Sequence, residues 1–364
     1  MRILYDGLVY AVQPAGGINR YFKNLIAHLP DNIQPTLTLC KPLSVDYPAH
    51  TNLKIKTNSQ LESLPDRLSL LLARLYFRNT IDFTNFNVIH PTYYCLFSRQ
   101  KLKEIKIPIV LTVWDMIHEI FSEEIDPKGY HIQMKQQAIL AADAILCISE
   151  NTKKDLMERY PISEDRIRVT YLASEIDIHM SYGNEIVPCQ SYFLYVGKRS
   201  GYKNFDCLLE AFAKSVSVKS NLSLCVVGSP FSKAEKEKIS ALKLWSYIEH
   251  YGYVNDLHLA KLYRCSRGLV YPSRYEGFGI PPLEAMACGT VVVAANCSSL
   301  PEVVGNSGIL FNPNSASDLA DIMLSLVSNS TKRTSLIESA CRRAKLFSWE
   351  KTTAQTAKSY QQIC

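Results

Sequence analysis

The sequence predicts an α/β protein of two domains that face one cleft, and three observations carry this prediction. Short apolar strands alternate with amphipathic helices along the chain, which is typical of parallel sheets covered on both faces. The 364 residues are enough for two domains with a core each. Both halves open with a strand, a glycine-containing loop and a helix, first at RILY and again at FLYVG.

In the first half, continuous apolar runs indicate the strands, and helical spacing of apolar residues indicates the helices between them. The expected elements are strands RILY, NVIH (87–90), IPIVLTVW (107–114) and AILCIS (144–149), with helices at about 17–29 and 131–142.

The strand pattern resumes after a segment, 169–190, that lacks helical periodicity and carries Gly183 and Pro188. We therefore expect a domain boundary near residue 185. The expected elements are strands SYFLYVG (191–197), LSLCVVG (222–228), IEHYGYV (248–254), GLVYPS (268–273), TVVVAA (290–295) and GILF (308–311), with a last helix at about 349–362.

The composition excludes several classes of protein. The 40 Lys and Arg against 34 Asp and Glu leave a net charge of only +6, and they are scattered, so a nucleic-acid partner is not indicated. Eleven cysteines without a Cys-x-x-Cys pair exclude a disulfide framework and a zinc site and indicate reduced thiols in a cytosol. The start, MRILYDGLVY, is typical of a first strand and not of a signal peptide.

The segment LPDRLSLLLARLYFRN (64–79) sets leucines at helical spacing, with Arg67, Arg74 and Arg78 elsewhere on the helix. A basic amphipathic helix can lie on anionic lipid, or it can pack on a core with its arginines in water. Of these alternatives we favour the packed helix. The segment is interrupted by Arg74 and too short to span a bilayer.

The segment SRYEGFGIPPLEAMACGTVVVAANCSSLPEVVG (273–305) separates Glu276 from Glu284 by seven residues. The glycines of GFG let a backbone approach a ligand closely, and the two prolines that follow suit a helix start. Glu284 is therefore expected in the first helical turn, where a carboxylate among free N–H groups is well placed to accept ribose hydroxyls. The alternative is a loop carboxylate and an ordinary helix acid.

Two further groups of residues are candidates for contacts with phosphate or sugar. GKRSGYKN (197–204) places Lys198, Arg199 and Lys203 around a glycine turn, as a diphosphate cradle or as a solvated basic loop. In the first half, glycines before a helix are candidates for phosphate contacts, and polar residues at strand ends for sugar contacts, because open α/β sheets bind ligands there. These are Gly16, Gly17, His90, Asp115 and His118; a helix-entry turn or a structural histidine is the alternative.

The Glu276–Glu284 segment resembles the retaining glycosyltransferases of family 4. The resemblance extends over GGINRYF, TVWDMIHE (112–119), CISENTKKDL (147–156), FLYVGKRSGYKN (193–204) and SWEKTTAQ, and is strongest to bacterial mannosyltransferases of surface polysaccharides such as lipopolysaccharide O-antigen and exopolysaccharide. It implies a GT-B fold of two Rossmann-like domains. Residues 1–185 would bind the acceptor, with 346–364 packed back on them, and 186–345 the donor.

The resemblance also implies roles for individual residues. Glu284 would hold the ribose, Glu276 would lie by the donor sugar, and Lys203 matches the family's phosphate-binding lysine, with Lys198 or Arg199 as second cation. The expected catalytic residues are Lys203, Arg199, Glu276 and His118; the expected donor contacts are Gly16, Gly17, Gly197, Lys198, Arg199, Lys203, Glu276, Gly277, Phe278, Gly279, Ile280 and Glu284; the acceptor-side candidates are His90, Asp115 and His118.

The implied reaction is transfer of a hexosyl unit, best matched by mannosyl from GDP-mannose, with retained configuration. The acceptor would be a hydroxyl of a glycan or lipid-linked glycan, in the cytoplasm or in weak peripheral contact with a membrane. No Asp-x-Asp occurs, so we expect no catalytic metal and no cofactor.

The alternatives are a noncatalytic nucleotide-sugar sensor or scaffold and a GT-B epimerase or phosphorylase. The sensor is suggested by Trp114, which stands where many relatives have His. A dehydrogenase is disfavoured, because no Gly-x-Gly-x-x-Gly follows the first strand.

Overall fold

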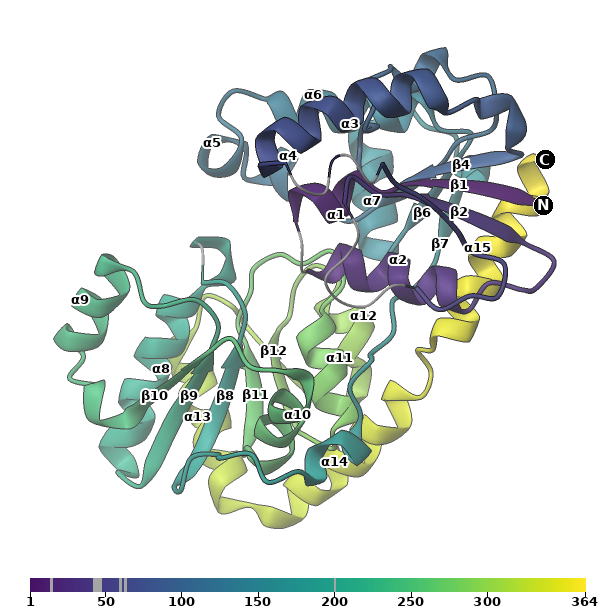
Figure 1. The fold of residues 1–364 in the computed structure, drawn as a ribbon. Helices are drawn as coiled ribbons and strands as arrows, with labels where there is room; N and C mark the ends of the chain where they lie inside the picture. The colour runs from purple at the N-terminus through teal and green to yellow at the C-terminus, as the bar shows by residue number, and fades with distance from the viewer. Residues whose placement is uncertain (14–15, 42–47, 59–60, 62–63, 200) are drawn as a thin grey trace. The chain divides into compact units, whose positions relative to one another are not determined.

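The computed structural model describes residues 1–13, 16–41, 48–58, 61, 64–199 and 201–364. Two compact units make up the protein (Figure 1). Unit 1 comprises Met1–Leu172 and Trp349–Cys364, and unit 2 comprises Ala173–Ser348. Within the described residues all strand pairings between named strands are parallel, which confirms the expected α/β class.

Unit 1 contains a four-stranded and a three-stranded sheet that meet at one bridge. The strand orders are β3-β2-β1-β4 and β5-β6-β7, and Ile89 bridges Ile109 where β4 meets β5. Strands β4, β5 and β6 are buried at every position, which is why they appear in the sequence as continuous apolar runs. The bounds are β1 Arg2–Asp6, β2 Gln34–Thr38, β3 Lys54–Lys56, β4 Val88–Pro91, β5 Val110–Val113, β6 Ala144–Cys147 and β7 Ile167–Val169.

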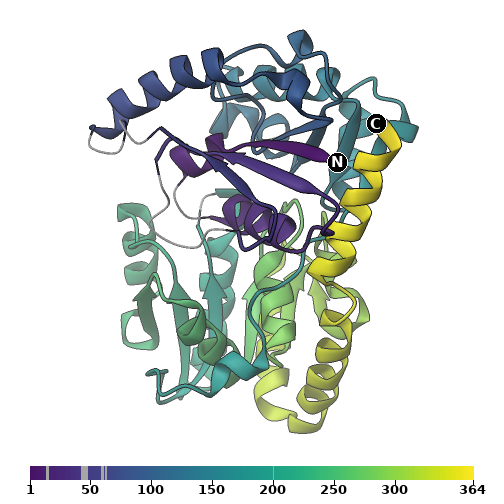
Figure 2. The ribbon, with the colours of Figure 1, turned by 45° about the vertical axis from the view of Figure 1, so that its right-hand side comes forward.

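The helices of unit 1 cover these sheets, and the last helix of the chain is one of them. The bounds are α1 Leu8–Val12, α2 Gly17–Ala27, α3 Asp66–Thr80, α4 Ile117–Ile120, α5 Ser122–Ile125, α6 Tyr130–Ala141, α7 Glu150–Arg159 and α15 Trp349–Ile363. Figure 2 shows α15 beside the strands of unit 1, with the two chain ends close together. The sulfur atoms of Cys364 and Met1 lie 3.6 Å apart.

Unit 2 is a six-stranded sheet in the order β10-β9-β8-β11-β12-β13, with helices around it. The strands are β8 Ser191–Val196, β9 Leu222–Val227, β10 Ile248–Gly252, β11 Gly268–Tyr271, β12 Val292–Ala295 and β13 Ile309–Phe311. The helices are α8 Phe205–Val218, α9 Lys233–Ala241, α10 Asp256–Cys265, α11 Ile280–Ala287, α12 Leu300–Val304, α13 Ala316–Ser328 and α14 Ser330–Ala344.

The change of unit comes after Leu172, earlier than the expected boundary near 185. The residues between these points pack on α10: Lys261 donates to the Gly183 carbonyl, and the Arg264 guanidinium lies 4.0 Å from the centre of the Tyr182 ring. An irregular segment gives no periodic signal of the unit to which it belongs, so loss of periodicity alone misplaces the boundary.

Helix α3 exposes part of the apolar surface that the sequence suggested would pack on a core. Its Ala73 and Phe77 are buried in a hydrophobic cluster, but Leu68, Leu71 and Leu75 are exposed. The packed-helix prediction is therefore wrong for this stripe of leucines. Among the described residues, no helix has the length and apolar character needed to cross a membrane.

Candidate active site

The candidate donor residues of unit 2 come from loops at one edge of its sheet. Strands β8, β11 and β12 are parallel neighbours, so the loops that follow them leave from the same, carboxyl edge. Lys203 follows β8, and Glu276 follows β11. The Arg274 N–H donates to the Tyr202 carbonyl at 2.8 Å, which ties these two loops together.

Lys203 and Glu276 form an ion pair at this edge. The Lys203 Nζ donates to Glu276 Oε1 at 2.6 Å, and the two side chains are only 14% and 10% exposed. The ammonium also lies 5.9 Å from the ring centre of Tyr271. Burial, and then the charge of Glu276, raise the pKa of the Tyr271 hydroxyl well above its ordinary value, so this hydroxyl stays protonated.

The loop that carries Glu276 is held by the two serines after β12. Ser298 Oγ accepts from the Glu276 N–H at 2.9 Å, and Ser299 Oγ donates to the carbonyls of Glu276 and Phe278 at 2.9 and 2.6 Å. Gly279 has φ 118°, and a Cβ there would lie 3.0 Å from Leu300. A side chain at this position would thus be strained, so the glycine is needed for the turn into α11.

The other predicted donor contacts in this loop differ in which of their atoms a ligand can reach. The Phe278 side chain is buried against Phe347, with ring centres 5.7 Å apart, so only its backbone can reach a ligand. Gly277 precedes it in the loop, and Ile280 is the first residue of α11.

Glu284 lies deeper in its helix than the sequence suggested. It is the fifth residue of α11, and the first turn, which holds both prolines, contains no acid. The first-turn prediction is wrong because the helix begins directly after Gly279. The Glu284 carboxylate is 5% exposed and accepts a hydrogen bond of 2.9 Å from the buried Tyr263 hydroxyl. Its position is therefore set by α10 as well as by α11.

Arg199 is occupied by contacts within unit 2. Its Nε donates to Glu235 at 2.6 Å, its Nη2 donates to the carbonyls of Ser229 and Pro230, and its side chain is 3% exposed. The guanidinium lies 4.7 Å from the ring centre of Phe231. Burial would raise the pKa of Glu235, but the hydrogen bonds from Arg199 and the Ser232 backbone hold it below its ordinary value. This arrangement fixes a loop and leaves little of Arg199 for a ligand.

Gly197 and Lys198 leave β8 next to open space. Gly197 has φ 129°, and a Cβ there would meet nothing within 4 Å. The Lys198 side chain is exposed, while its carbonyl accepts from the Tyr195 hydroxyl at 2.6 Å. Of the two alternatives for a second cation, Lys198 is the one that remains accessible.

In unit 1, Asp115 and His118 follow the carboxyl end of β5, as the sequence suggested, and a buried lysine organises them. The Lys135 side chain on α6 is 1% exposed, and its Nζ lies 2.8 Å from Glu119 Oε2 and 3.8 Å from Asp115 Oδ1. It also donates to the Asp115 carbonyl at 3.0 Å. Glu119 accepts in addition from Tyr160 at 2.9 Å. Lys135 gives no signal in the sequence, because a single lysine within a helix is usually in water.

His118 stacks on His131, the second residue of α6. Their ring centres are 4.3 Å apart, and the ring planes differ by 10°. Burial, then Lys135 and then His131 lower the pKa of His118 below its ordinary value. His118 is therefore a neutral imidazole at neutral pH, a form that can both accept and donate a hydrogen bond.

His90 and Trp114 belong to the core of unit 1. His90 is fully buried, with Nδ1 2.6 Å from the Tyr360 hydroxyl of α15 and Nε2 2.8 Å from Thr112 Oγ1. The prediction that His90 contacts an acceptor is therefore wrong, because both ring nitrogens are used inside the core. Trp114 packs edge-on against Tyr21 with ring centres 4.9 Å apart.

The burial of His90 makes unit 1 sensitive to acid. Burial lowers the pKa of His90 from 6.5 to about 3, so the unfolded chain takes up this proton at a higher pH than the folded one. Stability should therefore fall by about 1.4 kcal/mol per pH unit as the pH drops from 6.5 toward 3. Urea unfolding of the wild type and His90→Gln at several pH values measures this slope. Equal slopes in the two proteins would contradict it.

The glycines before α2 are placed at a helix start. Gly16 is the residue before the helix, and Gly17 is its first residue, where a Cβ would meet nothing within 4 Å. The preceding residues 14–15 lie outside the described residues.

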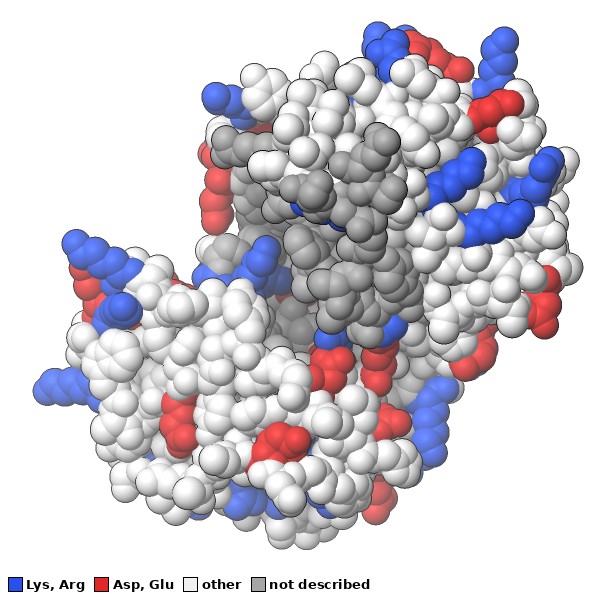
Figure 3. Space-filling model, in the orientation of Figure 1, with Lys and Arg blue, Asp and Glu red and all other residues white. Residues whose placement is uncertain are grey.

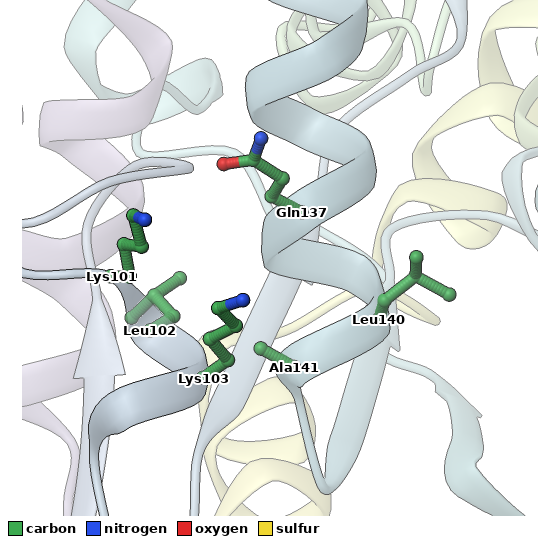
Figure 4. Close-up of a pocket in the computed structure, with 6 residues that line it drawn as sticks. All are labelled: Lys101, Leu102, Lys103, Gln137, Leu140 and Ala141. Atoms are coloured by element: carbon green, nitrogen blue, oxygen red, sulfur yellow. The ribbon is translucent and has the colours of Figure 1, made fainter.

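A surface pocket of about 270 Å³ lies apart from the predicted residues, in unit 1 (Figure 4). It is lined by Lys101, Leu102, Lys103, Gln137, Leu140 and Ala141. Its two walls lead into β5 and β6 at their amino ends, opposite the edge that carries Asp115. The residues that the structure describes contain no group of three or more His, Cys, Asp or Glu side chains arranged to hold a metal ion.

Comparisons with known proteins follow the division into units. A model described as Glycosyltransferase Family 4 matches residues 15–174, and one described as Glycosyl transferases group 1 matches residues 184–343. The O-antigen chain mannosyltransferase B of Escherichia coli is 32% identical over 248 residues, 65% of either chain. An uncharacterised glycosyltransferase of Methanocaldococcus jannaschii is 27% identical over 100% of this chain and 99% of its own.

Solved structures resemble the whole chain. Sucrose-phosphate synthase from Thermosynechococcus elongatus has a TM-score of 0.75 at 19% identity and covers 100% of this chain and 98% of its own. Anabaena HepE, solved in complex with UDP-glucose, has a TM-score of 0.70 at 17% identity, with both chains covered completely. At these identities the likeness shows the fold, which is GT-B. With one model on each unit, the chain belongs to the glycosyltransferases of family 4 and group 1.

Proposed function

We propose that this chain is a retaining, metal-independent mannosyltransferase that moves mannose from GDP-mannose to a hydroxyl of a growing glycan, including a lipid-linked one. The observation that carries the transfer chemistry is the Lys203–Glu276 pair at the carboxyl edge of the unit 2 sheet. The choice of mannose is supported by the name of the Escherichia coli relative, whose match spans 65% of its length.

Lys203 and Lys198 stabilise the diphosphate as it leaves. Arg199 is already paired with Glu235, so we assign it to the structure of the loop and the second cation to Lys198. In the reaction the bond from the sugar C1 to the diphosphate oxygen breaks, and a bond to the acceptor oxygen forms on the same face. The acceptor proton passes to the leaving diphosphate. Two preorganised cations lower the energy of the charge that develops there.

Asp115 and the neutral His118 contact the acceptor in this proposal. Their shared neighbour Lys135 is buried, so it holds the loop and does not reach the substrate.

The ion pair predicts that Glu276→Gln changes GDP binding and transfer in opposite directions. Without a donor, Glu276 neutralises Lys203, so a diphosphate must displace this carboxylate to bind the lysine. Removing the competing charge should tighten binding of GDP about fivefold while it lowers transfer. Calorimetric titration with GDP measures the first effect, and a turnover assay the second. Weaker GDP binding would show that Glu276 and the diphosphate do not compete for Lys203.

Glu284 is proposed to hold the ribose. Glu284→Gln keeps an oxygen that can accept from Tyr263 but removes the charge, so GDP affinity should fall about tenfold at an unchanged fold. Calorimetry gives the affinity, and Tyr263→Phe is the matched control because it leaves the carboxylate in place. A Glu284→Gln protein with wild-type affinity would exclude the ribose assignment.

A donor screen tests the function as a whole. The purified chain is heated with GDP-mannose, GDP-fucose, UDP-glucose, UDP-GlcNAc and ADP-glucose in the presence of EDTA, and the products are analysed by mass spectrometry. Selective stabilisation by GDP-mannose with transfer or slow hydrolysis is expected. If a donor binds but neither transfer nor hydrolysis occurs, even with glycan acceptors present, the result would favour the noncatalytic sensor. Trp114 is the residue that suggests this alternative.

A further inference from the structure

Helix α6 contacts the short helix α4 at two consecutive points. His131 of α6 stacks on His118 of α4, and Lys135, four residues after His131, donates to Glu119 at 2.8 Å. Residues four apart lie on the same face of a helix, so one face of α6 holds two neighbouring side chains of α4. Because α4 is a single turn of four residues, it has little rigidity of its own, and the orientation of His118 is set by α6.

Tyr93 extends the stacked pair from the loop after β4. Its ring stands edge-on to the His131 ring, with ring centres 5.8 Å apart and ring planes at 85°. The Tyr93 hydroxyl lies 3.4 Å from His131 Nδ1. Burial, and then the charge of Asp115, raise the pKa of Tyr93 above its ordinary value, so the hydroxyl stays protonated and can donate to this nitrogen. Strands β4 and β5 are parallel neighbours, so Tyr93, Asp115 and His118 lie at one carboxyl edge.

His118 has hydrogen-bonding capacity that the protein does not use. Its Nδ1 is a buried atom, and no partner for it occurs among the residues that the structure describes. This differs from His90, whose two ring nitrogens both have partners in the core. A buried polar atom without a partner costs free energy, so folding alone does not explain this one. A half-turn of the ring about its Cβ–Cγ bond keeps the stack on His131 and moves this nitrogen to the opposite edge of the ring. His118 is therefore able to bind a ligand without giving up the contact that holds it.

The segment that carries this group is acidic. Residues 115–135 contain five Asp and Glu residues against two lysines, and one of these lysines is buried in an ion pair with Glu119. Asp126 lies beside the stacked pair, since its Oδ2 accepts from the N–H of Ile132, the residue after His131, at 2.9 Å. Figure 3 shows acidic side chains at the end of unit 1 where α5 lies in Figure 1. A further carboxylate or a phosphate would be repelled here, whereas a hydroxyl would not.

We propose that His131 and Tyr93 hold His118 in a subsite for the terminal sugar of the acceptor, and that this subsite takes an uncharged sugar. The inference rests on the proposed function, because it names the kind of sugar that receives the transferred unit. Hydroxyls of a neutral sugar donate to the Asp115 carboxylate and to the unused ring nitrogen of His118. A uronic acid or a phosphorylated sugar at the same place would add a negative charge to an acidic segment. His131 acts through His118, so it is a positioning residue.

Two matched glycosides test the choice of an uncharged sugar. One is a mannose disaccharide, and the other is the same disaccharide with the terminal C6 hydroxymethyl group oxidised to a carboxylate. Binding of each to the full chain with GDP present is measured by ligand-observed NMR, which needs no turnover. We expect the neutral glycoside to bind at least about tenfold more tightly. Raised salt, and Asp126→Asn, which keeps an oxygen for the Ile132 N–H, should both narrow this difference.

Variants of His131 test its positioning role through kinetics. His131→Ala removes the stacking ring, so the KM for the neutral acceptor should rise about tenfold while the KM for GDP-mannose stays unchanged. His131→Phe keeps a flat ring in the stack and should restore most of the loss. Tyr93→Phe, which removes only the hydroxyl, should raise the acceptor KM about threefold. His50→Phe is the matched control: this histidine is half-buried in the same unit but lies before β2, at the amino edge of the sheet, and its loss should leave the acceptor KM unchanged.

The outcomes separate this inference from the proposed function. Equal or absent binding of the two glycosides by the wild type would overturn the choice of an uncharged sugar. A folded His131→Ala protein with the wild-type acceptor KM, or a His131→Phe protein no better than His131→Ala, would overturn the positioning role. A wild type that binds the neutral glycoside selectively but transfers no sugar from any donor would refute the transferase and leave the subsite in place.

Discussion

Lys203→Ala is expected to lower turnover by about a hundred- to a thousandfold. Loss of one preorganised charge contact to a developing anion costs about 3 to 4 kcal/mol of transition-state stabilisation. The 2.6 Å contact with Glu276 shows that the ammonium is held at the carboxyl edge of the sheet, beside Tyr271, before any donor arrives. Initial rates at saturating GDP-mannose, with the acceptor fixed, give the change in turnover.

Two further variants separate this role from folding. Lys203→Ala leaves the carboxylate of Glu276 without this partner at 10% exposure, so thermal stability should fall as well. Adding Glu276→Gln should restore much of the stability but none of the turnover. Lys233→Ala, which removes a lysine that is 92% exposed in the same unit, should change neither. A folded Lys203→Ala enzyme with wild-type turnover would remove Lys203 from the mechanism.

Lys135→Met is expected to destabilise unit 1 by about 3 to 5 kcal/mol. Breaking a buried ion pair from one side leaves the other charge uncompensated. Here Glu119, at 7% exposure, and the loop at Asp115 both lose the ammonium that neutralises them. Methionine keeps most of the volume of lysine, so the loss reports charge and hydrogen bonding more than packing.

The distribution of tryptophans allows this loss to be assigned to unit 1. The chain has three, and Trp114 and Trp349 belong to unit 1, while Trp245 belongs to unit 2 and is 47% exposed. In a Trp245→Phe background, urea unfolding followed by tryptophan fluorescence reports unit 1 alone. Lys135→Met with Glu119→Gln should recover part of the stability. A loss below about 1 kcal/mol in the single variant would show that Glu119 does not depend on Lys135.

The sequence predicted the strands that are buried along their whole length, such as β4, β5 and β6. The run NVIH is an example: it is a continuous apolar run, and β4, Val88–Pro91, is buried at every position. Strands β2, β3 and β7 have no counterpart among the expected strands, and β3 is exposed at every position, so it carries no apolar run that could indicate it. The proximity of Lys203 and Glu276 is likewise a matter of topology, because β8 and β11 are neighbours and both residues follow the carboxyl ends. When two motifs follow neighbouring parallel strands, the strand order alone predicts that they lie close together.

Features that depend on contacts between distant segments could not be predicted from the sequence. His90 follows the same strand-end pattern as Asp115, and its contacts with Thr112 and with Tyr360, 270 residues later, show that it is a core residue. The burial of Lys135 likewise depends on contacts with residues outside its own helix, Asp115 and Glu119. The periodicity of α3 revealed its apolar residues but not which of them lacks a neighbour, since an exposed and a buried leucine stripe have the same spacing.

The contribution of α15 to unit 1 reverses the order in which the two units can be completed during synthesis. The first residues of unit 1 precede unit 2, yet the hydroxyl of Tyr360 that meets His90 and Tyr5 is made only after all of unit 2. Unit 2 is one continuous stretch, Ala173–Ser348, and has all of its parts before α15 leaves the ribosome. Since domains fold as units while they are made, the second half of this protein can reach its native state while the first half still waits for its final helix.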